Sequence, residues 1–146
     1  MVKGIDFVGV SVVYFCHDGK GNFVMGKRSQ NARDEHGKWD IGGGGVEVLD
    51  SVEKTLEKEI MEEYCTEITH YEFLGFRDVF RNQADKVSHW VALDFKVSVN
   101  SETVKNGEPH KMEEVKWFNR QSMPSISECH SQWGFFLEKY KDKLWS

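Results

Sequence analysis

The chain has 146 residues, of which 39% are hydrophobic and 29% are charged, and it carries a formal net charge of −5. This length predicts one domain, residues 1–146, with a core large enough to need no disulfide or metal to hold it. The mild acidity, with Lys and Arg scattered along the chain, argues against the basic surface that binding of bulk nucleic acid requires. A single nucleotide stays open as a partner.

The cysteines Cys16, Cys65 and Cys129 are far apart and form no CxxC pair, which indicates neither a disulfide framework nor a zinc site. No apolar run approaches the ~18 residues of a membrane span. The N-terminal stretch also lacks the continuous apolar segment of a signal peptide. We therefore expect a cytoplasmic protein with reduced thiols that acts away from membranes as a monomer or homodimer.

The N-terminal part of the chain predicts a β-hairpin. Val8–Cys16 is rich in β-branched residues, as buried strands are, and the turn residues of His17–Asn22 lead into a second strand over Phe23–Arg28. Further on, a helix is predicted to begin at Asp50 or Ser51, both good capping residues, and to follow an apolar spacing of four. That spacing is set by Val52, Leu56, Ile60 and Tyr64.

The second half of the chain predicts further strands and a C-terminal helix. Two strands, Tyr71–Arg81 and Val87–Val99, flank a predicted turn at 82–86, and Glu114–Phe118 is typical of a short strand. The helix is predicted over Ser127–Trp145, with a stripe that we interpret as core: Trp133, Phe136, Leu137, Tyr140 and Leu144. Strands combined with one early and one late helix indicate an α/β (α+β) layered domain.

The predicted helix after residue 50 places Glu59, Glu62 and Glu63 on one face, because these residues lie three and four positions apart. That face borders the apolar stripe of the same helix, so the carboxylates should lie beside the core. Like charges crowded there are unfavourable unless a cation is present. Hard divalent ions such as Mg²⁺ prefer oxygen ligands and are often completed by substrate phosphates.

Four consecutive glycines, residues 42–45, precede this helix. They provide backbone that can approach a ligand closely, with carbonyls for a metal and N–H groups for phosphate oxygens. A glutamate-rich helix alone is more often a solvated surface, and a glycine run alone is more often a flexible loop. Their adjacency favours a site for metal-assisted attack of water on a phosphoanhydride.

The segment Gly44–Thr66 resembles the Nudix box, G-x5-E-x7-R-E-U-x-E-E-x-G-U, where U is a bulky aliphatic residue. The preceding WDIGGGGVE is similar to the family's usual W-x-L-P-G-G-x-V-E, and residues 107–124 resemble a segment of MutT-like members. The resemblance implies an α/β/α sandwich with a mixed central sheet, which hydrolyses a nucleoside diphosphate linked to another moiety. The box positions that match are Gly44, Glu59, Ile60, Glu62 and Glu63.

Several positions depart from the box. Asp50 stands in place of its first Glu, Lys58 in place of its Arg, and Leu49 in place of a glycine frequent in the loop. Cys65 and Thr66 replace its last glycine and aliphatic residue. A bridge between Lys58 and Asp50 would keep the charges without the bidentate fork of arginine. Leu49 would be strained if its φ were positive. We expect an active hydrolase; the alternative is a nucleotide-binding or sensor module with little or no turnover.

Position by position, the resemblance implies that Glu59, Glu63 and Glu62 are catalytic and bind Mg²⁺ or Mn²⁺, with the Gly43 carbonyl as a possible fourth ligand. Glu59 is alternatively the general base. One further carboxylate is expected from a downstream loop, with three candidates: Glu108, Glu113 and Glu114. The candidates for substrate contacts are Gly44, Arg28, Arg33 and Trp39; for the arginines a surface role, and for Trp39 a core role, stay open.

Other aromatic residues, Phe7 and Trp90, are alternative base-stacking groups, whereas His89 is expected to be a core histidine. Two substrate signatures of the family are absent. The only prolines, Pro109 and Pro124, are not where ADP-ribose enzymes carry one, and residues 82–84 lack the tyrosine of dinucleoside polyphosphate enzymes. The MutT-like resemblance therefore favours a small-molecule nucleotide, a nucleoside triphosphate cut to monophosphate and pyrophosphate.

Overall fold

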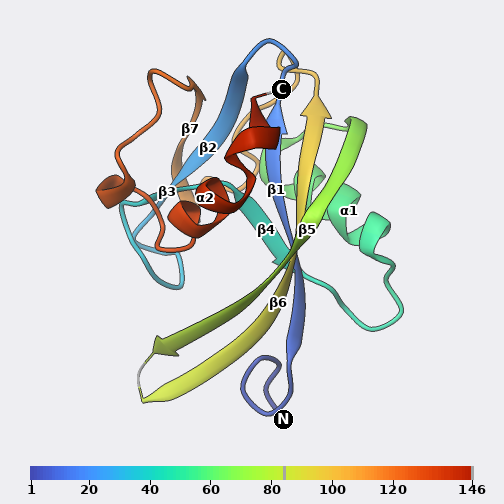
Figure 1. Ribbon diagram of the computed structural model, residues 1–146, viewed down its shortest axis with the longest axis vertical. Coiled ribbons are helices and arrows are strands. Elements are labelled where there is room, and N and C mark those ends of the chain that lie inside the picture. The colour runs from blue at the N-terminus through green and yellow to red at the C-terminus, as the bar shows by residue number, and fades with distance from the viewer. Residues whose placement is uncertain (84, 146) are drawn as a thin grey trace.

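The computed structural model describes residues 1–83 and 85–145, and Ala84, within the predicted turn, lies outside them. Over these residues the chain forms a mixed sheet of seven strands. One helix packs on each face of this sheet, α1 (Val52–Tyr64) on one and α2 (Trp133–Leu144) on the other (Figure 1). The layered α/β/α arrangement with a mixed central sheet is confirmed.

The strand β1 (Gly9–His17) lies at the centre of the sheet. It pairs antiparallel with β2 (Asn22–Arg28) and with β4 (Gly42–Gly45). Along its whole length it also pairs in parallel with β6 (Lys86–Val99), and this pairing makes the sheet mixed. The predicted N-terminal hairpin is confirmed, with boundaries within one residue.

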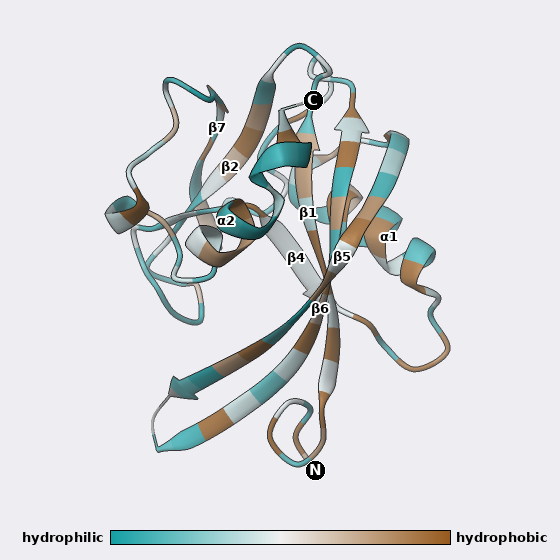
Figure 2. Ribbon diagram, in the orientation of Figure 1, coloured by the Kyte–Doolittle hydropathy of each residue, from teal (hydrophilic) through white to brown (hydrophobic). Residues whose placement is uncertain are grey.

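The main path of the sheet runs β3-β2-β1-β6-β5, with β7 pairing β2 and β4 pairing β1. The outer strands are β3 (Trp39–Asp40), β5 (Ile68–Gln83) and β7 (Met112–Asn119). The strands β5 and β6 form a hairpin longer than predicted, because the ladder continues to the pair Gln83–Lys86. This hairpin projects away from the rest of the molecule, with apolar and polar residues alternating along it (Figure 2).

The helix α1 begins and ends as the capping residues dictate. Ser51, not Asp50, is the N-cap, and its side chain accepts a hydrogen bond from the Lys54 N–H at 3.0 Å. The helix ends at Cys65, which has a left-handed φ of 58°. Its apolar stripe packs with residues of one face of β1, and the fully buried members of this cluster include Leu56, Ile60, Tyr64, Val12 and Tyr14.

The helix α2 begins later than predicted. A single 3₁₀ turn, η1 (Ile126–Glu128), comes first, and Cys129 is then extended. The His130 N–H donates to the Trp39 carbonyl at 2.8 Å, so this backbone pairs with β3 and cannot be helical. The predicted apolar stripe of α2 is confirmed as core, with Trp133, Phe136, Tyr140 and Leu144 buried on the sheet face opposite α1.

Candidate active site

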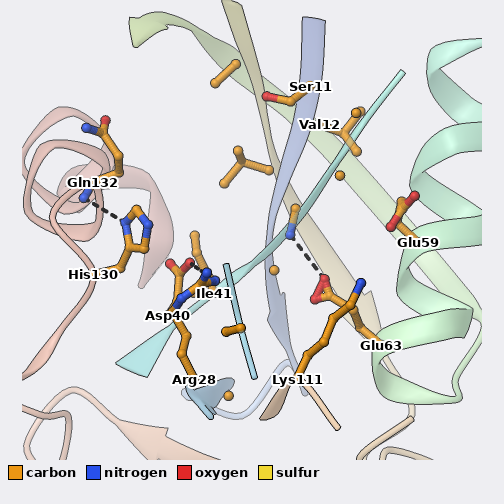
Figure 3. Close-up of a pocket in the computed structure, with 18 of the residues that line it drawn as sticks. Ser11, Val12, Arg28, Asp40, Ile41, Glu59, Glu63, Lys111, His130 and Gln132 are labelled. Carbon is orange, nitrogen blue, oxygen red and sulfur yellow. Dashed lines mark hydrogen bonds and ion pairs between the residues drawn. The ribbon is translucent and has the colours of Figure 1, made fainter. Parts of the chain in front are cut away.

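A cavity of about 640 Å³ opens between β4, one face of α1 and the beginning of α2 (Figure 3). The strands β1 and β2 form its base, and the segment before β7 closes one side. The residues that concern its chemistry are Asp40, Gly43, Glu59, Glu62, Glu63 and Glu108. All three glutamates predicted from the helix therefore line one cavity.

The four glycines form the strand β4 and are not the flexible loop that a glycine run alone suggests. They pair with residues Ser11–Tyr14 of β1. A Cβ atom on Gly42 would lie 2.1 Å from the Tyr14 ring, and one on Gly44 would lie 2.3 Å from the Glu59 carboxyl carbon. Side chains at these positions would therefore collide with the acidic side of the cavity, so the glycines allow β4 to lie directly against it.

The three glutamates differ in burial. Glu63 is 9% exposed, Glu59 is half-buried and Glu62 is exposed. Figure 3 shows the Glu59 and Glu63 side chains extending from α1 toward β4. The sequence placed these residues on one helix face; the structure shows that this face turns from the core at Glu63 to solvent at Glu62.

Glu63 is held by two donors. The Tyr14 hydroxyl donates to Glu63 Oε1 at 2.6 Å, and the Gly43 N–H donates to the same oxygen at 3.3 Å. The pKa of Glu63 is raised to about 8, chiefly by burial and also by the nearby Glu108, against the two hydrogen bonds, which lower it. Among the described residues, no ion pair balances the negative charge of the Glu63 carboxylate.

The negative charge of the Glu59 carboxylate is likewise not balanced by an ion pair in the described residues. Burial raises the pKa of Glu59, and the neighbouring Glu62 and Glu108 add to it, while Lys58 and Lys111 oppose it. Among the described residues, neither Glu59 nor Glu63 forms an ion pair. An oxygen-rich group that lacks a counter-charge fits a hard divalent cation, which would stabilise all of these carboxylates in their charged form.

A second acidic group contacts Arg28, Arg81 and His130, which line the cavity. In the described part of the chain, only Asp34, Glu35 and His130 bring three metal-ligand atoms within 4.8 Å of one another; the α1 glutamates are not gathered so closely. The second group is already neutralised, however. Arg81 donates to Asp34 at 3.1 Å and to Glu35 at 2.6 Å, and Arg28 donates to Asp34 at 2.8 Å.

His130 completes this second group in a neutral form. Burial lowers the pKa of His130 to about 4. Its Nδ1 accepts from the Gln132 N–H at 3.1 Å, which leaves the proton on Nε2, 2.9 Å from a Glu35 oxygen. A metal at Nε2 would have to displace that proton, so we interpret the group as a brace between the 34–35 segment, β5 and the start of α2.

The three candidates for a downstream carboxylate differ in whether they line the cavity. Glu108 lines the cavity, whereas Glu113 and Glu114 do not. Glu113 pairs with Lys27 at 3.3 Å on the surface, and Glu114 is exposed on β7. Among the three predicted candidates, only Glu108 is placed near the α1 glutamates, together with Lys111, which sequence reasoning did not single out.

The predicted substrate contacts are also placed unequally. Arg28 and Arg33 line the cavity, but Arg28 is engaged by Asp34 and Arg33 is 77% exposed. Trp39 packs edge-on against Phe118 with ring centroids 5.0 Å apart, in the core beneath α2. Gly44 lies in the cavity wall beside Glu59.

Of the remaining aromatic candidates, Trp90 lines the cavity and Phe7 does not. The expectation for His89 was wrong. It is not in the core but lies half-exposed on the projecting hairpin, with Nε2 2.9 Å from Asp78. The apolar neighbours of His89 in the sequence belong to a strand whose outer part has water on both faces, and so they do not signal burial there.

Asp40 is a cavity residue that the sequence did not reveal. Burial raises its pKa to about 7, with Glu35 adding to the effect and Arg28 opposing it. Arg28 is its ion-pair partner at 4.0 Å. Its position between the predicted Trp39 and the glycine run was the available signal, but residue type alone gave it no role.

Two of the departures from the box occur where the backbone is unusual. Leu49 has φ of 74° and Cys65 has φ of 58°, both in the left-handed region that favours glycine. Lys58 lies 3.9 Å from Asp50, but Lys54 is nearer at 3.1 Å. The chain thus keeps the backbone that the box glycines would favour while carrying side chains there.

A family model for the NUDIX domain matches residues 7–136. The chain belongs to the Nudix family. It is therefore a Nudix hydrolase, and its family supports hydrolysis of a nucleoside diphosphate linked to another moiety. Hydrolases of this family generally use a divalent metal, which agrees with the oxygen-rich group on α1. In the part of the chain that the structure describes, neither helix is long and apolar enough to cross a membrane.

Solved Nudix and MutT structures share the fold. The chain is similar to a MutT Nudix hydrolase from Burkholderia pseudomallei, at 24% identity and a TM-score of 0.77, covering 90% of this chain and 96% of that one. It is also similar to a MutT protein from Methanosarcina mazei, at 22% identity and a TM-score of 0.71, covering 93% and 94%. A MutT protein from Bacillus halodurans matches at 16% identity and 0.68, covering 94% and 86%.

Proposed function

We propose that the protein hydrolyses a nucleoside triphosphate to the monophosphate and pyrophosphate, with Mg²⁺ as its cofactor. The observation that carries this proposal is the group of Glu59, Glu63 and Glu108, which line one cavity, and in the described residues the first two form no ion pair. Mg²⁺ binds through one or two carboxylates and substrate phosphates, and this group offers that ligand set.

The residues of the cavity would divide into cation ligands and a phosphate contact. Glu63 and Glu59, with Glu62 at the solvent side and the Gly43 carbonyl, would hold the cation. When bound, Mg²⁺ supplies charge that polarises the phosphoanhydride and makes the attacking water more acidic. Lys111, exposed at the cavity edge, is placed to meet a phosphate oxygen.

In the chemical step, water adds to one phosphorus atom of the α–β bridge as the bond from that phosphorus to the bridging oxygen breaks. One proton of the water passes to Glu108, or to Glu59 in the alternative in which Glu59 is the general base and not a cation ligand, and the bridging oxygen leaves with its electron pair on the other product. No oxidant or second substrate is needed.

A panel of nucleoside triphosphates and diphosphate-linked nucleotides, incubated with Mg²⁺, tests this proposal. Free phosphate is followed with and without added inorganic pyrophosphatase, so that pyrophosphate release is seen directly. We expect triphosphate turnover that needs the pyrophosphatase for the phosphate signal. Because the pyrophosphatase itself needs Mg²⁺, the EDTA arm follows conversion of the triphosphate to the monophosphate by ion-exchange chromatography, and this conversion should stop. Turnover that survives EDTA unchanged would overturn the mechanism.

The alternative, a Nudix-fold binding or sensor module, is favoured by the left-handed Leu49, in place of a glycine frequent in the loop, and by the left-handed Cys65, in place of the last glycine of the box. The same panel distinguishes it. Nucleotide affinity measured by calorimetry, without turnover of any member, would establish the binding module and reject the hydrolase. If the panel shows turnover, the variants Glu59→Gln and Glu108→Gln identify the base, since the variant that lacks the base loses rate while it keeps its nucleotide affinity.

A further inference from the structure

Tyr14 lies in the middle of β1 and is fully buried, at 0% exposure. Its hydroxyl reaches across to α1 and donates to Glu63 Oε1 at 2.6 Å. We propose that Tyr14 is a positioning residue, which fixes the Glu63 carboxylate so that its second oxygen is aimed at the cation. This inference rests on the proposed function, because it needs Glu63 to be a metal ligand.

The hydrogen bonds to Glu63 are unequally shared between its oxygens. Both donors, the Tyr14 hydroxyl and the Gly43 N–H, reach Oε1. The other oxygen, Oε2, faces Gly42, where an added Cβ would lie 2.9 Å from it. A carboxylate tied through one oxygen cannot rotate without breaking those bonds, so Oε2 keeps one direction and stays available to a ligand.

The fold holds Tyr14 itself in place. It packs edge-on against Tyr64, with ring centroids 6.2 Å apart and an interplanar angle of 84°. The backbone of Tyr14 is paired on both sides, opposite Gly42 of β4 and Phe95 of β6. The donor is therefore carried by the central strand of the sheet, while the acceptor is carried by a helix end. Tyr14 links the two.

Tyr64 provides a matched control. It is also buried, at 1% exposure, and belongs to the same cluster. In the described residues, the Tyr64 hydroxyl has no hydrogen-bond partner. Tyr64→Phe therefore removes the same atom from the same aromatic pair, but breaks no hydrogen bond. A difference between the two variants reports the bond to Glu63 and not the loss of a buried hydroxyl.

The experiment measures Mn²⁺ binding to the full chain without nucleotide, from the electron paramagnetic resonance signal of free Mn²⁺, for the wild type, Tyr14→Phe, Tyr64→Phe and Glu63→Gln. We expect Tyr14→Phe to weaken Mn²⁺ binding about 10- to 100-fold, the usual effect of losing a group that orients a metal ligand. Tyr64→Phe should bind as the wild type does. At saturating Mn²⁺, the KM of Tyr14→Phe for nucleotide should stay within about twofold of the wild-type value.

Unchanged Mn²⁺ affinity in Tyr14→Phe, with loss in Glu63→Gln, would overturn the role of Tyr14 and leave the proposed function standing. Unchanged affinity in Glu63→Gln would instead reject the metal site itself. If Tyr14→Phe does not fold, a ring-fluorinated tyrosine at position 14 gives the second test, since it is a stronger donor of nearly the same size. The Mn²⁺ affinity should change with it at position 14 and not at position 64, and equal affinities would again overturn the proposal.

Discussion

Two acidic groups, one lining the cavity and one contacting the cavity residues Arg28, Arg81 and His130, differ in what neutralises them. In one group, the carboxylates of Asp34 and Glu35 accept hydrogen bonds from the guanidinium groups of Arg28 and Arg81 at 2.6–3.1 Å. In the other group, Glu59 and Glu63 form no ion pair with any residue in 1–83 or 85–145, and the pKa of each is raised. Distance alone ranks the first group as the tighter cluster.

Under the proposed function, the balance of charge around acidic atoms is a better guide to a metal site than their proximity. A group whose charges are already balanced gains little from a cation, because the cation would have to replace arginines that hold the acids in place. An unbalanced group gains more, since the cation relieves the cost of burying like charges together. The predictions below test this contrast, beginning with the largest effect.

Glu63→Gln should lower kcat on the order of 10³-fold at saturating Mg²⁺, because it removes a ligand charge from the reacting centre. The matched change in the balanced group, Glu35→Gln, should stay within about threefold of the wild-type rate. Steady-state kinetics with the substrate identified by the nucleotide panel measures both. Equal losses in the two variants would mean that both groups take part in the chemistry.

Arg81→Met should destabilise the fold by about 2 kcal/mol, because it leaves two half-buried carboxylates without their shared cation. Urea unfolding gives this value, and the slope of the transition should not change. The Mn²⁺ affinity of the variant should equal that of the wild type. A drop in affinity would show that the brace and the α1 group are coupled across the cavity.

The stability of the protein in EDTA should fall as the pH rises from about 6.5 to 8, above the range in which the lowered pKa of His130, about 4, acts in the opposite direction. Glu63 and Asp40 have folded-state pKa values of about 8 and about 7, above those of an unfolded chain. In this range the folded state binds more protons than the unfolded state, so the free energy of unfolding decreases with pH, by up to about 1.4 kcal/mol per pH unit for each group. Thermal melts across this range measure it.

Glu63→Gln is the control for this pH effect, since an amide does not titrate. Its stability should depend less on pH than that of the wild type, most clearly between pH 7 and 8, where only Glu63 still holds its proton. Wild-type stability that increases over the same range would contradict the assigned direction of both pKa shifts.

Leu49→Gly should have the smallest effect, a gain of up to about 1 kcal/mol. Leu49 is 99% exposed and has φ of 74°, so its side chain contributes no burial and its backbone is strained. Relief of that strain is worth about 1–2 kcal/mol, against about 0.4–1 kcal/mol for the extra freedom of glycine in the unfolded chain. Urea unfolding decides between them, and a loss of stability would show that the entropy term is larger.

The sequence predicted the elements that have a regular apolar pattern. The strand β1 follows from its richness in β-branched residues, and the helix α1 follows from the four-residue spacing of Leu56, Ile60 and Tyr64. The strand β4 could not be recognised in this way, because four glycines carry no side-chain pattern. The late start of α2 was also missed, since it depends on the pairing of Cys129 with Trp39, residues distant in the sequence.

For the candidate site, the three glutamates were found because one helix carries them and the box spacing marks them. The selection of Glu108 over Glu113 and Glu114 needed the path of the segment before β7, which local sequence does not determine. The residue types of Tyr14 and Asp40 alone indicated no role, because their role depends on contacts between separate elements. The neutralisation of Glu35 could not be predicted either, because Arg81 is distant in the sequence and forms its ion pair with Glu35 only in the folded chain.

The parallel pairing of β1 with β6 has a consequence for synthesis in the cell. Gly9 pairs with Trp90, which is 81 residues further along the chain. At roughly 5–20 residues per second, β1 leaves the ribosome about 4–16 s before its partner has been made. During that interval one edge of an apolar strand stays open to other chains, so the yield of folded protein should depend on chaperones that bind nascent chains and should fall when β6 is translated slowly.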